Sequence, residues 1–136
     1  MTLNQIPEGF RKSATRGPFA EKIGPLYFMR EGEAYRYGFL VDESHTNYNG
    51  ILHGGMMMSF MDETMGQTIW YAVDRQRTAT ISLNFDFVAS AKVGDWLEMK
   101  CKIVRQGVSV VFIRGELMCG DTIVMTADGV WKIIGR

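Results

Sequence analysis

The sequence is poor in the residues that build disulfide and metal sites. It has two cysteines, Cys101 and Cys119, and two histidines, His45 and His53. Two cysteines without a CxxC spacing cannot form a dense disulfide framework, and both fall in strand-like segments, where a small buried residue is expected. We therefore expect no metal site and a reducing, cytoplasmic location.

The sequence also lacks an excess of charge and an unbroken apolar run. Lys plus Arg number 15, as do Asp plus Glu, so the formal net charge is zero. Such a balance gives no strong overall electrostatic attraction to nucleic acid. The longest apolar-rich stretch, 50–73, is interrupted by His53, Asp62 and Glu63, and the N-terminus has no basic region followed by an apolar run. We therefore expect a soluble chain without nucleic-acid or membrane partners.

Apolar residues make up 46% of the chain, and their spacing predicts one long helix and about six strands. The helix is expected over 54–73, after a short helix over 18–23. The strands are expected over 26–30, 34–41, 78–87, 96–105, 108–118 and 122–134, with a bulge at Gly129. Residues 1–17 are polar and irregular. Because an apolar helix must be buried, we predict an α+β fold, a curved antiparallel sheet wrapped around one long central helix.

A helical wheel divides the long helix into two faces. One arc is predicted to face the sheet, and it comprises Met57, Phe60, Met61, Thr64, Met65, Thr68, Tyr71 and Ala72. Asp62 lies at the edge of this arc beside Gly55, Met58, Ser59, Gly66 and Ile69. Three of these neighbours are small, which leaves space beside the carboxylate. An acid inside an apolar helix is costly unless it is paired or used in chemistry.

The densest chemical signal is the run Asn47 to Gly55, which leads into this helix. A helix N-terminus offers unpaired N–H groups and a partial positive charge, and glycines at 54 and 55 allow another group to approach the backbone. Such a position suits an oxyanion or a polarised carbonyl. Each feature alone also has a simpler reading: His53 as a cap, the glycines as a turn, and Asp62 as a surface acid.

The pattern of Asn47, Gly50, His53-Gly54-Gly55 and Asp62 resembles the hotdog-fold acyl-CoA thioesterases. The phenylacetate-degradation type, related to a mammalian enzyme with a broad acyl-CoA range, is the most similar group. Three downstream segments, 82–85, 91–95 and 105–107, resemble the family in order and spacing. The resemblance covers residues 35–134 and implies a hotdog domain over 35–136. An N-terminal segment, 1–34, with the short helix and the first strand completes a single domain.

The resemblance implies a role for each matching residue. The Gly54 N–H would polarise the thioester carbonyl, His53 would support that turn and contact the thioester, and Asn47 would orient the water or the carbonyl. Asp62 would be the nucleophile or the general base, and Thr80 would hold the water. One departure is Gly66, where related enzymes often carry Ser or Thr, so a hydroxyl is missing and the acyl pocket is enlarged.

The resemblance also implies how the substrate and the subunits are arranged. Substrate contacts are expected from Gly55 and from Arg105, Gln106 and Gly107 at the CoA nucleotide, with Phe87 nearby. The site would straddle a homodimer interface, and two dimers would pack into a tetramer. No cofactor is expected, because CoA is part of the substrate.

Two other functions compete with hydrolysis. A hotdog dimer could bind acyl-CoA without cleaving it, although a carboxylate beside a thioester serves hydrolysis better than storage. A hotdog hydratase or dehydratase usually needs an acid and a histidine aimed at the acyl carbons, and the only other histidine is His45, in a loop. A thiol-release assay separates hydrolysis from binding.

Overall fold

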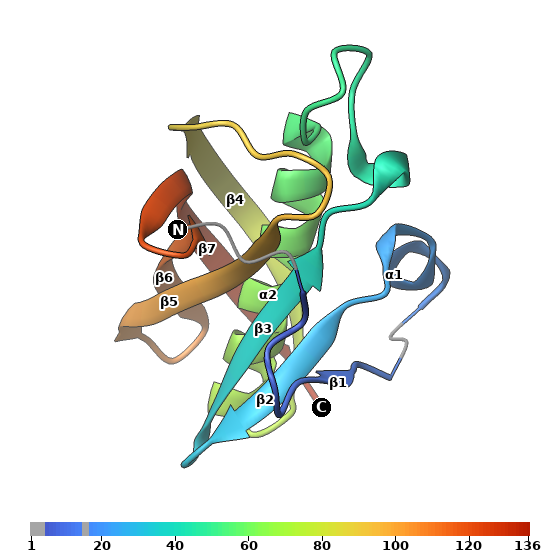
Figure 1. Cartoon of the computed structure of the whole chain (residues 1–136). Coiled ribbons are helices and arrows are strands. Elements are labelled where there is room, and N and C mark those ends of the chain that lie inside the picture. The colour runs from blue at the N-terminus through green and yellow to red at the C-terminus, as the bar shows by residue number, and fades with distance from the viewer. Residues whose placement is uncertain (1–4, 15–16) are drawn as a thin grey trace.

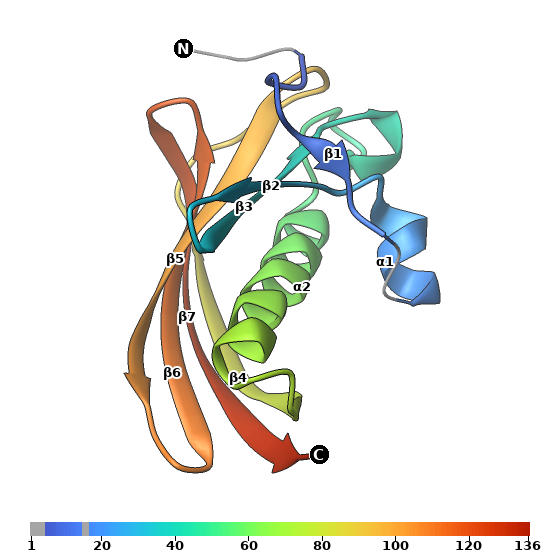
Figure 2. The ribbon, with the colours of Figure 1, turned by 90° about the horizontal axis from the view of Figure 1, so that it is seen from below.

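One long helix, α2 (Gly54–Ala72), lies in the hollow of a curved antiparallel sheet (Figure 1). The computed structural model describes residues 5–14 and 17–136. Figure 2 shows four strands, β5, β6, β7 and β4, curving along one side of α2, while α1 lies apart from them. Strand β3 runs beside α2, because Phe39 packs on Phe60 and Tyr35 packs on Tyr71. This is the predicted architecture.

The remaining elements follow the predicted order with two additions. The helices are α1 (Pro18–Ile23) and a 3-10 turn, η1 (Glu43–His45), and the strands are β1 (Arg11–Lys12), β2 (Tyr27–Glu31), β3 (Ala34–Leu40), β4 (Arg77–Phe87), β5 (Trp96–Gln106), β6 (Val110–Cys119) and β7 (Thr122–Gly135). The additions are η1 and β1. The short strand β1 lies within the segment 1–17 that we predicted to be irregular, of which 1–4 and 15–16 are outside the described residues.

Among the described residues the sheet has seven strands, in the order β1-β2-β3-β5-β6-β7-β4. Hairpins join β5 to β6 and β6 to β7, whereas β4 lies at the far edge, beside β7. The other edge of β4 has no neighbour in this part of the chain. Strands β3 and β5 pair only over 37–40 and 96–99, so they separate toward the end of α2.

The buried face of α2 matches the predicted arc over its first three turns but not its last. The residues of α2 that are fully or nearly fully buried are Met56, Met57, Phe60, Met61, Thr64, Met65 and Ile69. The prediction was wrong for Tyr71 and Ala72, which are exposed, because the separation of β3 from β5 uncovers the last turn. Tyr71 stacks instead on Tyr35 of β3, with ring centroids 4.9 Å apart.

The predicted bulge at Gly129 was wrong. Gly129 pairs regularly with Leu83 on β4 and with Ile113 on β6. A Cβ at this position would lie 2.4 Å from Cζ3 of Trp131 and 2.8 Å from Cδ1 of Leu83, so the glycine makes room for two core side chains. The bulge lies on β4, where Thr80 pairs with Trp131, Ser82 pairs with Val130, and Ile81 is the extra residue between them.

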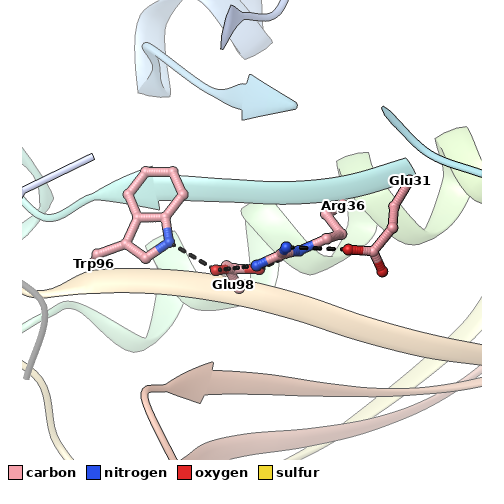
Figure 3. Close-up of polar contacts among 4 residues, drawn as sticks. All are labelled: Glu31, Arg36, Trp96 and Glu98. Atoms are coloured by element: carbon pink, nitrogen blue, oxygen red, sulfur yellow. Dashed lines mark hydrogen bonds and ion pairs between the residues drawn. The ribbon is translucent and has the colours of Figure 1, made fainter. Parts of the chain in front are cut away.

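Phe10 packs on the face of the sheet away from α2. Phe10 packs edge-on against Trp96, with ring centroids 4.9 Å apart, and the Arg36 guanidinium lies 5.3 Å from the Phe10 ring centroid. Figure 3 shows the polar part of this cluster, in which the Glu98 carboxylate accepts hydrogen bonds from Trp96 Nε1 and from Arg36. Partial burial alone would lower the pKa of Arg36, but its bonds to Glu98 and Glu31 raise it.

Candidate active site

A helix and an edge strand bring Asp62 and Thr80 together. The Thr80 hydroxyl donates a hydrogen bond to Oδ1 of Asp62 over 2.9 Å. Both side chains are exposed in the single chain, in a groove between α2 and β4. The residues that line it are Asp62, Glu63, Gly66, Gln67, Trp70, Arg77, Thr78, Thr80 and Ile134. The carboxylate therefore has one oxygen held by Thr80, and it lines an open groove.

The bulge in β4 aims Thr80 at the helix. In a regular strand Thr80 and Leu83, three residues apart, would face opposite sides of the sheet. Because Ile81 is extra, Thr80 lies on the same side as Leu83, which packs against the core. Ala79, Ile81 and Leu83 alternate in the sequence as if they shared one face, but the bulge breaks this alternation, and Ile81 is 58% exposed. Bulges commonly redirect one side chain in this way.

The N-terminus of α2 presents one N–H without a partner. His53 is the N-cap, and its Nδ1 accepts the Gly55 N–H over 2.7 Å. The His53 carbonyl accepts the N–H groups of Met56 and Met57. The Gly54 N–H donates to no other group of the described residues, so it is the one directed outward with the helix dipole behind it. The Nε2 atom of His53 is the ring nitrogen left for a substrate.

The glycines at this turn are required by close contacts. A Cβ at Gly54 would lie 2.8 Å from Cε1 of Phe87, and a Cβ at Gly55 would lie 2.9 Å from Nδ1 of His53. The Phe87 ring, 56% exposed at the end of β4, thus forms a wall directly beside the Gly54 amide. A planar apolar surface therefore borders the free N–H.

Asn47 organises the loop that precedes the helix. Its side-chain Oδ1 accepts the backbone N–H groups of Asn49 and Ile51, over 2.9 and 3.3 Å. Its backbone closes the same turn by accepting from Gly50 and donating to Ile51. The carbonyl oxygen of this side chain is occupied, so only its NH₂ group is left to orient a water or a carbonyl.

His45 supports the site from behind, a role that the sequence did not predict. It is 3% exposed, its Nε2–H donates to the Ile23 carbonyl over 2.7 Å, and its Nδ1 accepts the Asp42 N–H over 3.1 Å. Its own carbonyl accepts the His53 N–H over 2.8 Å. His45 therefore connects α1, η1 and the turn that leads to His53. The Asp42-x-x-His45 spacing, which forms a capping box here, is the signal that could have revealed it.

One chain does not bring Asp62 to the free amide of Gly54. Asp62 follows Gly54 by eight residues along α2, and at about 1.5 Å per residue the two lie about 12 Å apart along the axis. A thioester carbonyl cannot contact both groups across that distance. The structure thus divides the candidate residues into Asn47, His53, Gly54 and Phe87 at the start of α2, and Asp62 and Thr80 farther along.

The residues predicted to contact CoA lie at opposite ends of α2 within one chain. Arg105 and Gln106 end β5 and Gly107 begins the turn after it, and Gln106 Nε2 donates to the Ala72 carbonyl over 3.4 Å. Ala72 ends α2, whereas Phe87 packs at its start, so about 27 Å of helix separates them. Within a single chain Phe87 therefore does not lie near Arg105 to Gly107, and their expected nearness stays a prediction for a site shared by two chains.

The described residues contain neither a metal-binding cluster nor a membrane-spanning helix. Within 5–14 and 17–136, no group of three or more His, Cys, Asp or Glu side chains is placed to hold a metal ion. In the same ranges, no helix combines the length and the apolar character that a membrane span needs.

Comparison with known proteins gives matches over much of the chain. The family model for the thioesterase superfamily matches residues 49–126. A Pseudomonas aeruginosa protein named "Putative esterase" is 29% identical over 133 residues, which cover 96% of this chain and 99% of that protein. Mouse acyl-coenzyme A thioesterase 13 is 26% identical over 89 residues, 65% of this chain and 64% of its own length.

Solved structures confirm the hotdog fold. A phenylacetic acid degradation-related protein from Ralstonia eutropha superposes with a TM-score of 0.77 at 22% identity, covering 88% of this chain and 92% of its own. A hypothetical thioesterase from Streptococcus pneumoniae, solved with coenzyme A, gives a TM-score of 0.73 at 18% identity, with coverage of 82% and 90%. The resemblance found in the sequence, to the phenylacetate-degradation type, is confirmed as well.

Proposed function

The chain belongs to the thioesterase superfamily, and from that premise we propose that it hydrolyses acyl-CoA thioesters to a free acid and CoA. Two of its relatives support the choice of substrate: the mouse relative is named an acyl-coenzyme A thioesterase, and the Streptococcus pneumoniae structure contains coenzyme A. The proposed catalytic residues are Asp62, Thr80, Gly54, His53 and Asn47.

The observation that carries this proposal is that the chain holds two complementary halves of a hydrolytic site. Asp62, fixed by Thr80, is a base or nucleophile that faces an open groove. The free Gly54 N–H is an oxyanion donor, and it lies about 12 Å away on the same helix. Two copies with antiparallel α2 helices bring each half to its complement and form two equivalent sites. We therefore propose a homodimer, and a dimer of dimers as the complete assembly.

In this arrangement the chemistry needs a base and an oxyanion donor. Asp62 removes a proton from water as the water oxygen bonds to the thioester carbonyl carbon. The carbonyl electron pair moves to its oxygen, which accepts the Gly54 N–H of the second copy. When the C=O bond re-forms, the C–S bond breaks and the CoA thiolate takes the proton from Asp62. In the alternative route the Asp62 carboxylate attacks first, and water then hydrolyses the resulting anhydride.

The substrate-binding residues complete the proposal. Phe87 and Gly55 border the carbonyl at the start of α2, and Arg105, Gln106 and Gly107 contact the CoA nucleotide. Because Phe87 and Arg105 lie at opposite ends of α2 within one chain, one CoA contacts them only if they come from different copies.

A thiol-release assay over a panel of acyl-CoAs tests the activity. Asp62 is exposed in the single chain, so Asp62→Asn is expected to fold normally and to lose turnover by at least about 10³-fold. Acyl-CoA binding without thiol release by the wild-type protein would identify a binding protein instead. Full turnover by Asp62→Asn would remove this carboxylate from the chemistry.

Complementation tests the shared site. Gly54→Pro deletes the proposed oxyanion N–H, and proline suits the first helical position after His53, whose φ of −67° and ψ of 134° fit a residue before proline. Phe87→Ala provides the space for the proline ring. The single Phe87→Ala variant shows how much activity this second substitution costs by itself. Asp62→Asn and the Gly54→Pro/Phe87→Ala variant should each be inactive. Random mixing of the two should restore about a quarter of the wild-type sites, because half of the dimers carry one intact site, in which Gly54 and Phe87 come from the Asp62→Asn chain.

A further inference from the structure

The indole N–H of Trp131 is a donor without a protein partner. Trp131 is 2% exposed. Every side-chain nitrogen or oxygen that the described residues bury completely has a hydrogen-bond partner, yet no group in this part of the chain accepts from Trp131 Nε1. The N–H therefore belongs to the small part of Trp131 that water can reach.

This N–H opens beside Asp62, under Gly66. A Cβ built on Gly66 would lie 3.4 Å from Trp131 Nε1, and that nitrogen is the nearest atom to it. Gly66 lines the same groove as Asp62 and lies one helical turn beyond it, a rise of about 6 Å. Trp131 is also the β7 partner of Thr80, the residue that holds the Asp62 carboxylate. The Trp131 N–H thus lies behind Gly66 and on the strand next to Thr80, and both of these residues line the groove.

We infer that the Trp131 N–H binds the water that attacks the carbonyl, as a third polar contact beside Asp62 and Thr80. This inference rests on the proposed function. A water that contacts two groups at hydrogen-bond distance spans up to about 6 Å, which matches the rise from Asp62 to Gly66. Gly66 leaves the path to the nitrogen open.

The Trp131 N–H, which can only donate a hydrogen bond, acts on the water differently from a hydroxyl, which can also accept one. Water has two O–H groups and two lone pairs. Asp62 accepts one O–H, and the Thr80 proton is already committed to Asp62. The Trp131 N–H cannot accept a hydrogen bond, so it binds one lone pair of the water oxygen. The other lone pair is left to attack the carbonyl carbon. The role is the same in both routes, because water attacks a carbonyl beside Asp62 in each.

Packing alone does not explain glycine at position 66. The nearest atoms to its Cβ position lie at 3.4 and 3.8 Å, which are ordinary contacts. Alanine would therefore fit, and it is a much better helix former than glycine. What alanine would change is access to the Trp131 N–H, which its methyl group would cover.

Two variants eliminate the contact of the Trp131 N–H with water, one by covering it and one by replacing it, and they differ in their effect on Tm. Gly66→Ala covers it and should raise Tm. Replacing Trp131 with 3-benzothienylalanine keeps the ring shape, exchanges N–H for sulfur, and should leave Tm nearly unchanged. In both, kcat should fall about tenfold, the effect of one neutral hydrogen bond, while KM for the acyl-CoA changes little. A merely structural role predicts that kcat follows Tm, so Gly66→Ala would then be at least as active as wild type.

The outcomes separate this inference from the proposed function. If Asp62→Asn is inactive while both variants keep wild-type kcat, the hydrolase proposal stands and the role of Trp131 is refuted. If KM rises and kcat does not fall, Trp131 contacts the substrate and not the water, which also refutes the inference. A wild-type protein that releases no thiol from any acyl-CoA refutes both.

Discussion

Thr80 and Leu83 face the same side of β4 although three residues separate them, because Ile81 between them has no partner on β7. Without this extra residue a regular alternation that places Leu83 in the core would direct Thr80 away from α2. The bulge therefore creates the 2.9 Å hydrogen bond to Asp62. The position of the proposed base depends on a backbone irregularity as much as on the residue itself.

Thr80→Val should test this hydrogen bond with almost no change in shape. The Thr80 side chain is exposed in the single chain, so the free energy of unfolding should change by less than about 0.5 kcal/mol. Loss of the hydroxyl frees the Asp62 carboxylate to rotate, and kcat should fall about tenfold. Thr80→Ser, which keeps the hydroxyl, is the matched control and should retain most turnover. Equal activity of the Val and Ser variants would show that the bond is not needed.

His53 has two functions that substitution can separate. Its Nδ1 caps α2 by accepting the Gly55 N–H, and its Nε2 is available to the thioester. Serine is a good N-cap, so His53→Ser should keep the wild-type free energy of unfolding, whereas His53→Ala should lose about 1 kcal/mol. Both should lose turnover by about tenfold if Nε2 contacts the substrate. Chemical denaturation and thiol release measure the two effects, and a fully active His53→Ser would reduce His53 to a cap.

The sequence predicted the helix and most of the sheet. It did so because the signals are local: a 3.6-residue period with glycines at the start gives α2, and alternation in β5 places Leu97, Met99 and Cys101 toward the core. The resemblance to a family supplied the roles of Asp62 and Gly54, which no period of apolar residues could provide.

The errors share a physical cause, which is long-range contact. The bulge at Ile81 depends on the register with β7, and the exposure of Tyr71 depends on where β3 leaves β5. Gly129 is regular because Trp131 and Leu83 fill the space above it. A glycine in a strand indicates a special requirement, but whether that requirement is a bulge or room for a neighbour is decided by residues distant in the sequence.

Asp42 should make the catalytic turn sensitive to acid. Partial burial alone would raise the pKa of Asp42, but hydrogen bonds from Ser44 and the nearby His45 lower it below its usual value. The ionised form is therefore favoured by folding, and its contribution is complete above the unfolded pKa of about 3.9. It is lost as pH falls through the lower, folded pKa. Asp42→Asn keeps a capping side chain without the charge, so it is the matched comparison.

This pH dependence is measured as the difference in Tm between wild type and Asp42→Asn. The difference should be constant from pH 7 to about pH 5 and should shrink below about pH 4. A difference that grows as the pH falls would contradict the direction of the shift. Since Asp42 and His45 close the turn that leads to His53, kcat should be lost together with the Tm difference.

Gly38→Ala should be the most damaging single methyl addition in the sheet. A Cβ at Gly38 would lie 2.2 Å from Cζ2 of Trp96 and 2.8 Å from the Leu97 carbonyl oxygen, so either the ring or the backbone must move. Trp96 is 1% exposed and is fixed by Glu98 and Phe10, which leaves it little freedom to shift. Overpacking of this kind costs about 3 kcal/mol, and Tm should fall accordingly.

A double-mutant cycle with Trp96→Phe identifies the source of that cost. Phenylalanine lacks the ring atoms that would meet the new methyl group, so Gly38→Ala should cost at least about 1 kcal/mol less in this background. The remaining cost comes from the Leu97 carbonyl, which the second substitution leaves in place. Additive effects of the two substitutions would show that the backbone contact alone requires glycine, and a neutral Gly38→Ala would contradict the close approach of Trp96 to β3.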